Sequence, residues 1–178
     1  MKKHPLELLL PTRGVRMLAV VILAALTLWI SWIMQRLARG IEPGILAFEF
    51  AGTPDRARSI LDAWGVSGEA RMLAQLGLDN WWLFFYSTTL ALLCVMIAIR
   101  IRAYALRWAS IGTALAWAVW GAALLDRIEN FALARIINGD ITAAWTSTAF
   151  VCAGTKFLIV ILCLLYIIGS PFFSRKRS

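Results

Sequence analysis

Four long apolar runs constrain this chain more than any other feature. They cover about residues 17–34, 81–99, 108–125 and 149–168. A helix that crosses a bilayer needs ~20 mostly apolar residues, and each run reaches that range. The first run is longer than the ~7–15-residue apolar core of a signal peptide, so we read it as a retained span. We therefore predict an all-α polytopic membrane protein, with residues 1–178 forming a single four-transmembrane-helix bundle.

The composition supports this class and argues against others. Of the 178 residues, 61% are hydrophobic and 16% are charged, whereas soluble domains are ~45–50% apolar and ~25% charged. The net charge is +8, but the basic residues flank the apolar runs instead of gathering on one amphipathic face, so nucleic-acid binding is not expected. The expected partners are membrane lipids, with other membrane proteins or further copies of the chain left open.

The cysteines and the histidine predict no cofactor and no metal site. Cys94, Cys152 and Cys163 lie in apolar runs without CxxC spacing, so we expect small buried side chains instead of disulfides or a redox motif. His4, the single histidine, falls in a polar N-terminal tail. Haem or zinc sites that need histidines in the core are therefore not expected.

The basic residues also predict an orientation. If the N-terminus is inside, the inner segments hold ten basic residues and one acid, and the outer segments hold seven basic residues and nine acids. The inner segments are then residues 1–16, 100–107 and 169–178, and the outer ones are residues 35–80 and 126–144. Because Lys and Arg are enriched in cytoplasmic loops, both termini are predicted to be cytoplasmic. The compact Leu-, Ala-, Arg- and Trp-rich chain favours a bacterial plasma (inner) membrane.

The outer segment of residues 40–78 is predicted to contain two short helices. The first covers residues 54–64, where Thr-Pro-Asp begins an apolar stripe with helical spacing, and it is expected to stop at Gly65. The second covers residues 69–76 and is expected to break at Gly77. This segment is either a lid over a site between the spans or an interfacial helix lying in the headgroup layer.

Two further local patterns concern the outer end. The third apolar run keeps helical spacing from Asp126 to Ile137, and Asn138-Gly139 is a plausible stop. The segment 48–52, Phe-Glu-Phe-Ala-Gly, is expected to dock the outer loop onto the spans.

Polar residues gather in the outer halves of all four runs. Thr27, Ser31 and Gln35 share one face of the first run. The candidate ligand-binding residues on the other runs are Asp79, Tyr86, Asp126, Glu129, Asn130 and Lys156. The inner halves contain almost no polar side chain. The pattern predicts a polar pocket that opens to the outside and is closed below by an apolar plug.

Lys156 lies about seven residues, or ~10 Å, into the fourth run. A lone charge there costs ~2.5–3.5 kcal/mol, so we expect it to pair with Asp79, Asp126 or Glu129. Each residue also has a structural interpretation: Asp79 as a helix cap, the other two acids as headgroup-solvated, Tyr86 as an interface aromatic, and Lys156 as an ion-pair partner only. We predict that Lys156→Met harms folding less than Asp126→Asn combined with Glu129→Gln, because it leaves only acids that can reach the interface, whereas the double change leaves the lysine unpaired.

Three functions fit these residues. The first is binding of an amphipathic ligand such as a lipid or isoprenoid, with the head in the pocket and the tail between helices. The second is an intramembrane enzyme at the outer face, with Asp79, Asp126 and Glu129 in acid/base roles and Lys156 tuning a pKa or stabilising an oxyanion. The third is a structural or assembly subunit of a larger membrane complex.

One short stretch resembles a known family. Residues 121–127, Gly-Ala-Ala-Leu-Leu-Asp-Arg, resemble the glycine-rich stretch ending in Asp-Arg of signal peptidase II, another small four-span protein. That family also needs an aspartate at the start of its last span, where residues 144–150 hold no acid. The resemblance is confined to about seven residues, and no catalytic role is carried over from it.

Overall fold

The computed structural model describes residues 4–174, which form helices and no strand. The helices are α1 (Pro5–Leu9), α2 (Arg13–Ala38), α3 (Ile45–Glu49), α4 (Pro54–Ile101), α5 (Leu106–Ile137) and α6 (Ala143–Ser174). Four of them, α2, α4, α5 and α6, are long and apolar enough to cross a membrane. The all-α fold and the four long apolar helices are thus as predicted.

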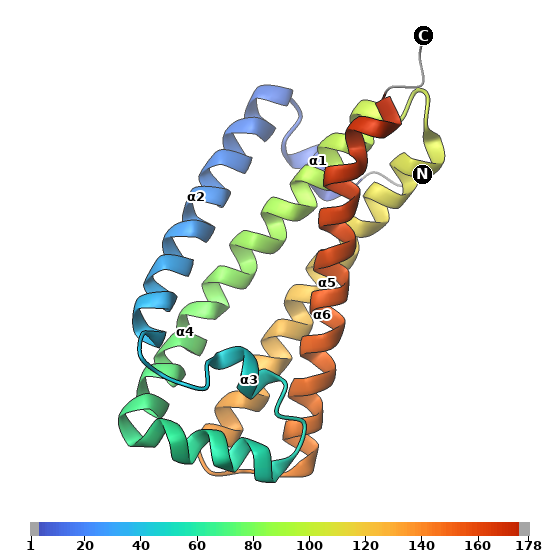
Figure 1. Cartoon of the computed structure of the whole chain (residues 1–178). Helices are drawn as coiled ribbons and strands as arrows, with labels where there is room; N and C mark the ends of the chain where they lie inside the picture. The colour runs from blue at the N-terminus through green and yellow to red at the C-terminus, as the bar shows by residue number, and fades with distance from the viewer. Residues whose placement is uncertain (1–3, 175–178) are drawn as a thin grey trace.

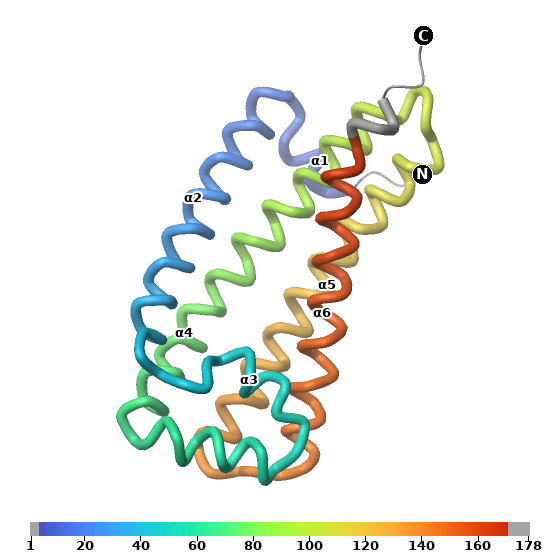
Figure 2. Tube along the Cα trace, in the orientation of Figure 1, coloured from blue at the N-terminus to red at the C-terminus, as the bar shows by residue number. Residues whose placement is uncertain are grey.

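Helix α4 is central to the packing. It contacts α2 on one side and α5 and α6 on the other, and α6 also packs along α5. The chain places α1 and the C-terminal end of α6 at one end of the molecule, the α1 end (Figure 1). Helix α3 and the turn from α5 to α6 lie at the opposite end, the α3 end (Figure 2).

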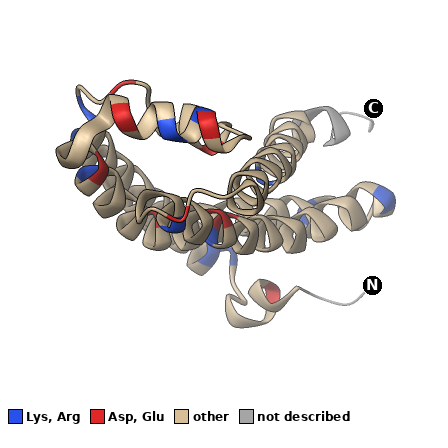
Figure 3. Cartoon of the chain, turned by 90° about the horizontal axis from the view of Figure 1, so that it is seen from below, with Lys and Arg blue, Asp and Glu red and all other residues tan. Residues whose placement is uncertain are grey.

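Helix α4 begins as the sequence predicts. The Thr53 hydroxyl accepts a hydrogen bond from the Arg56 backbone N–H, and Pro54 occupies the first turn. The section up to Trp64 turns its apolar side chains inward and its charged ones outward, and it crosses the α3 end (Figure 3). At Gly65 the backbone takes φ +60° and ψ 175°, a combination open almost only to glycine, and the helix changes direction.

The predicted break at Gly77 is wrong. From Val66 the helix continues without interruption to Ile101. The expected short helix over residues 69–76 is therefore part of this long second section of α4. A glycine inside a helix costs only ~0.5–1 kcal/mol relative to alanine. Burial of Met72 and Leu76 in the core at the α3 end outweighs that cost.

Helix α5 continues to Ile137 and ends at Asn138, with Gly139 at φ +95°, as predicted. The turn into α6 is held by Asp140, whose Oδ2 accepts hydrogen bonds from Arg135 and from the Trp145 indole N–H at 2.8 Å. Hydrogen bonding to the arginine lowers the pKa of Asp140. This turn fixes the relative direction of α5 and α6 at the α3 end.

The N-terminal segment is packed, in contrast to the polar tail expected around His4. The His4 ring is fully buried, with its centroid 4.7 Å from those of Trp117 and Trp120. Burial lowers the pKa of His4. Glu7 forms a 2.7 Å ion pair with Arg102, so α1 is tied to the end of α4. From the sequence, His4 was assigned to a polar tail because the two tryptophans that bury it lie more than 100 residues further along the chain.

The core toward the α1 end is apolar. Leu92, Val95, Val119 and Cys163 are all completely buried where α4, α5 and α6 meet. All three cysteines are buried and free of disulfides, as expected. This apolar packing lies beneath the polar residues described next and separates them from the α1 end.

Candidate functional site

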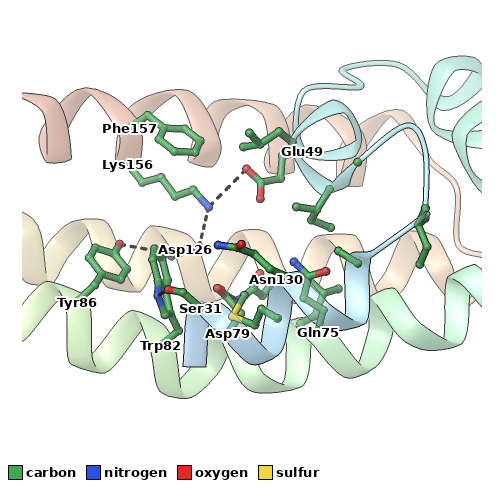
Figure 4. Close-up of a pocket in the computed structure, with 18 of the residues that line it drawn as sticks. Ser31, Glu49, Gln75, Asp79, Trp82, Tyr86, Asp126, Asn130, Lys156 and Phe157 are labelled. Atoms are coloured by element: carbon green, nitrogen blue, oxygen red, sulfur yellow. Dashed lines mark hydrogen bonds and ion pairs between the residues drawn. The ribbon is translucent and has the colours of Figure 1, made fainter. Parts of the chain in front are cut away.

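A pocket of about 590 Å³ lies near the α3 end, lined by residues of α2, α3, α4, α5 and α6 and of the loop before α3. Its polar lining residues are Ser31, Gln35, Glu42, Glu49, Gln75, Asp79, Trp82, Tyr86, Asp126, Asn130 and Lys156. Figure 4 shows these side chains converging from several helices. Of the six candidate residues from the sequence, five line the pocket, and Glu129 lies directly behind it as a partner of Lys156.

Lys156 is the centre of the cluster. Its Nζ lies 2.7 Å from Asp126 Oδ1 and 3.0 Å from Glu129 Oε1, and it donates a hydrogen bond to each. Glu49 Oε2 lies 3.7 Å from the same nitrogen. The lysine is 7% exposed, and Asp126 and Glu129 are 1% and 0% exposed. The expected pairing of Lys156 with these acids is confirmed, and headgroup solvation of Asp126 and Glu129 is excluded by their burial.

Helical spacing on α5 explains this arrangement. Asp126 and Glu129 are three residues apart and therefore share the face that α6 packs against. On the α4 side, the Tyr86 hydroxyl donates to Asp126 Oδ2 at 3.2 Å. Tyr86 is 7% exposed, so it is a buried member of the site and not an interface aromatic.

Asp79 lies on the α4 wall of the pocket. The Asn130 side-chain amide donates to Asp79 Oδ2 at 2.5 Å, which brings two of the candidate residues together. The interpretation of Asp79 as a helix cap is wrong, because α4 starts at Pro54 and runs through this position. Asp79 forms no ion pair with Lys156 within the described residues.

Glu49 is a member of the site that the sequence interpretation did not include. Helix α3 brings it over the pocket, and the flanking aromatics hold it there: Phe48 packs on Trp64, and Phe50 packs on Phe150 and Phe157. The segment therefore docks as expected. Burial raises the pKa of Glu49, against the opposing effect of the nearby lysine. The sequence feature that could have identified Glu49 is its position as an acid between two phenylalanines in an otherwise apolar segment.

Gln75 is the second residue missed. It is 7% exposed and lines the pocket, and its Oε1 has no hydrogen-bond partner among the described residues. Its signal was spacing, because Gln75, Asp79, Trp82 and Tyr86 form one stripe along α4. That stripe is visible only if the helix passes unbroken through Gly77.

Helix α2 forms the remaining wall. Ser31 and Gln35 line the pocket, and Ser31 Oγ accepts a 2.6 Å hydrogen bond from the Trp82 indole N–H. The hydroxyls of Thr27 and Ser31 donate to backbone carbonyls of their own helix. Ser31 thus attaches α2 to α4.

The site has more carboxyl groups than basic groups. Three buried acids (Glu49, Asp126, Glu129) approach Lys156, the one basic residue on the pocket wall in the described part of the chain, and a fourth, Asp79, lies on the α4 wall. Such a site can bind hydrogen-bond donors or hold protons. No known protein family, no curated protein and no solved structure matches this chain.

Proposed function

We propose that the chain is an integral membrane protein, a four-helix bundle whose pocket binds the polar head of an amphipathic ligand such as a lipid or isoprenoid. The observation that carries the proposal is the pocket itself, in which buried charged residues and apolar residues line one cavity. Its volume of about 590 Å³ falls within the ~300–1,000 Å³ of ligand sites. Buried charges on apolar helices are, by default, functional.

The helix packing supports a path for the tail. Helix α2 packs mainly against α4, and α6 mainly against α5, so α2 and α6 do not close the pocket between them. Met34 on α2 and Val160 on α6 both line the pocket, next to Phe157. An apolar chain can leave between these helices into lipid, and the head group then stays beside Lys156.

The orientation proposed from the basic residues fits this arrangement. The α3 end, with the pocket, faces the outside of a bacterial plasma membrane, and both termini are cytoplasmic. The charged, exposed face of residues 54–64 then meets the outer headgroup layer. The apolar core toward the α1 end closes the pocket on the cytoplasmic side.

The test is native mass spectrometry of protein gently extracted from its own membrane, with lipid analysis of what remains bound. We expect one enriched amphiphile on the wild type. It should be lost in Val160→Trp, which fills the pocket, and kept in Leu158→Trp, whose side chain is 58% exposed on the same helix. A bare chain, or an assembly in which a partner protein covers the pocket, would contradict the proposal; the latter would favour the subunit function.

A further inference from the structure

We infer that the head group recognised by this pocket is a protonated amine, with N–H donors, and not a phosphate or another anion. The inference rests on the proposed function and specifies the chemistry of its ligand. It depends on three features of the pocket: the acids that surround the lysine, the unused acceptors on the opposite wall, and the balance of charge.

The lysine is surrounded by carboxyl groups. An ammonium group carries three N–H donors; Nζ of Lys156 donates two of them, to Asp126 at 2.7 Å and Glu129 at 3.0 Å, and Glu49 lies 3.7 Å away. A phosphate that took the remaining donor would lie beside these three acids. Like charges at such distances repel strongly where water is excluded.

Acceptors, in contrast, are available. Gln75 lines the pocket and extends from α4 beside Asp79 in Figure 4, and its Oε1 is buried with no donor among the described residues. A buried acceptor without a partner is unfavourable, so a ligand that supplies a donor removes that cost. Asp79, one turn further along α4, receives one hydrogen bond, from Asn130, and a carboxylate can accept several.

The charges point in the same direction. Asp79 lies on the pocket wall opposite the lysine cluster, without an ion-pair partner among the described residues. A cation between Asp79 and Gln75 would supply the missing positive charge and also the missing donor. A primary ammonium group does both, whereas a quaternary ammonium has no N–H and an alcohol has no charge.

The test compares head groups on one tail. Delipidated protein in a non-ionic detergent is titrated at pH 7 with dodecylamine, dodecyltrimethylammonium, dodecanol and dodecyl phosphate, and binding is measured by calorimetry. Because charge-assisted hydrogen bonds are stronger than neutral ones, we expect dodecylamine to bind about tenfold more tightly than the other three.

Variants locate the recognition. Asp79→Asn should weaken dodecylamine binding at least about fivefold and leave dodecanol binding unchanged. Asp62→Asn, which removes an exposed acid from the same helix outside the pocket, should change neither. If Asp79→Asn does not fold, Gln75→Leu provides the second test, since it removes the unpaired acceptor and preserves an apolar stem; it should also weaken amine binding.

The outcomes separate the two proposals. Equal or tighter binding of dodecyl phosphate, or amine binding that neither variant weakens, would overturn the amine inference while the amphiphile-binding function stands. If none of the four probes binds to the wild type, or if Val160→Trp binds them all as the wild type does, the proposed function fails and the inference fails with it.

Discussion

Lys156 Nζ on α6 lies 2.7 Å from Asp126 Oδ1 on α5. The side chain of the lysine is 9% exposed and that of the aspartate is 2% exposed. Glu129 and Glu49 approach the same nitrogen. The lysine therefore connects α6 to α5 and to α3, and its loss should affect both the fold and the pocket.

The first prediction is that Lys156→Met destabilises the protein more than Asp126→Asn combined with Glu129→Gln. Removing the lysine leaves three carboxyl groups facing one another without a cation. The double variant keeps amide oxygens as acceptors and keeps Glu49 as an ionic partner. Breaking a buried pair by removing one partner costs ~3–5 kcal/mol.

This order is the reverse of the expectation from the sequence, which relied on acids that could reach the interface. Asp126 and Glu129 are 1% and 0% exposed and cannot do so. Thermal unfolding in detergent measures the difference, with Thr155→Met, an exposed neighbour of the lysine, as the control. A lower Tm for the double variant than for Lys156→Met would contradict the structural argument.

The second prediction concerns pH and Glu49. Burial raises the pKa of this carboxyl in the folded state above its unfolded value. The folded state therefore binds the proton more tightly, so the contribution of Glu49 to stability is largest at low pH and is lost as pH rises through the folded pKa. The Tm of the wild type minus that of Glu49→Gln should increase as pH falls from 8 to 5.

Thermal unfolding of both proteins across this range gives the difference directly. Asp62→Asn, which removes an exposed acid of α4 outside the pocket, is the control for the loss of one carboxylate. A difference that grows with rising pH would mean that the fold stabilises the charged form of Glu49, and would reject the assigned direction.

The sequence was sufficient for the long helices because their signal is local. Apolar length predicted α2 and α6, and the Asn138-Gly139 stop predicted the end of α5. Helical spacing likewise put Asp126 and Glu129 on one face. The cost of burying a lone lysine then predicted that Lys156 pairs with them.

The missed features depend on contacts between distant segments. Glu49 belongs to the site because α3 folds back over α6; the local sequence predicted that residues 48–52 dock, but not that the acid would meet Lys156. Gln75 was missed because a glycine was given more weight than the packing around it. A residue such as Gly77 costs little in a helix, whereas the buried stripe through Asp79 and Tyr86 gains much more.

The third prediction uses two glycines of α4. Gly65→Ala should destabilise the protein by ~1–3 kcal/mol, because φ +60° with ψ 175° is strained for any residue with a Cβ. Gly77→Ala should stabilise it by ~0.5–1 kcal/mol, since Gly77 is helical and its added Cβ would meet no atom within 4 Å.

Both glycine variants add one methyl group to the same helix, so each is the control for the other. Thermal unfolding in one detergent gives the two changes in Tm, which should have opposite signs. A stabilised Gly65→Ala variant would show that α4 does not turn at this residue. A Gly77→Ala variant as unstable as Gly65→Ala would mean that α4 breaks at Gly77, as predicted from the sequence.

The fourth prediction tests the proposed orientation. Val66 is 85% exposed beside the turn in α4 at the α3 end, and Ala103 is exposed between α4 and α5 at the α1 end. In intact cells, a membrane-impermeant maleimide should label Val66→Cys and should label Ala103→Cys only after lysis. The native Cys94, Cys152 and Cys163 are buried, so the unaltered chain gives the background.

Labelling of Ala103→Cys alone in intact cells would contradict the proposed orientation. It would place the pocket on the cytoplasmic side, because the α3 end and the pocket lie together in the fold.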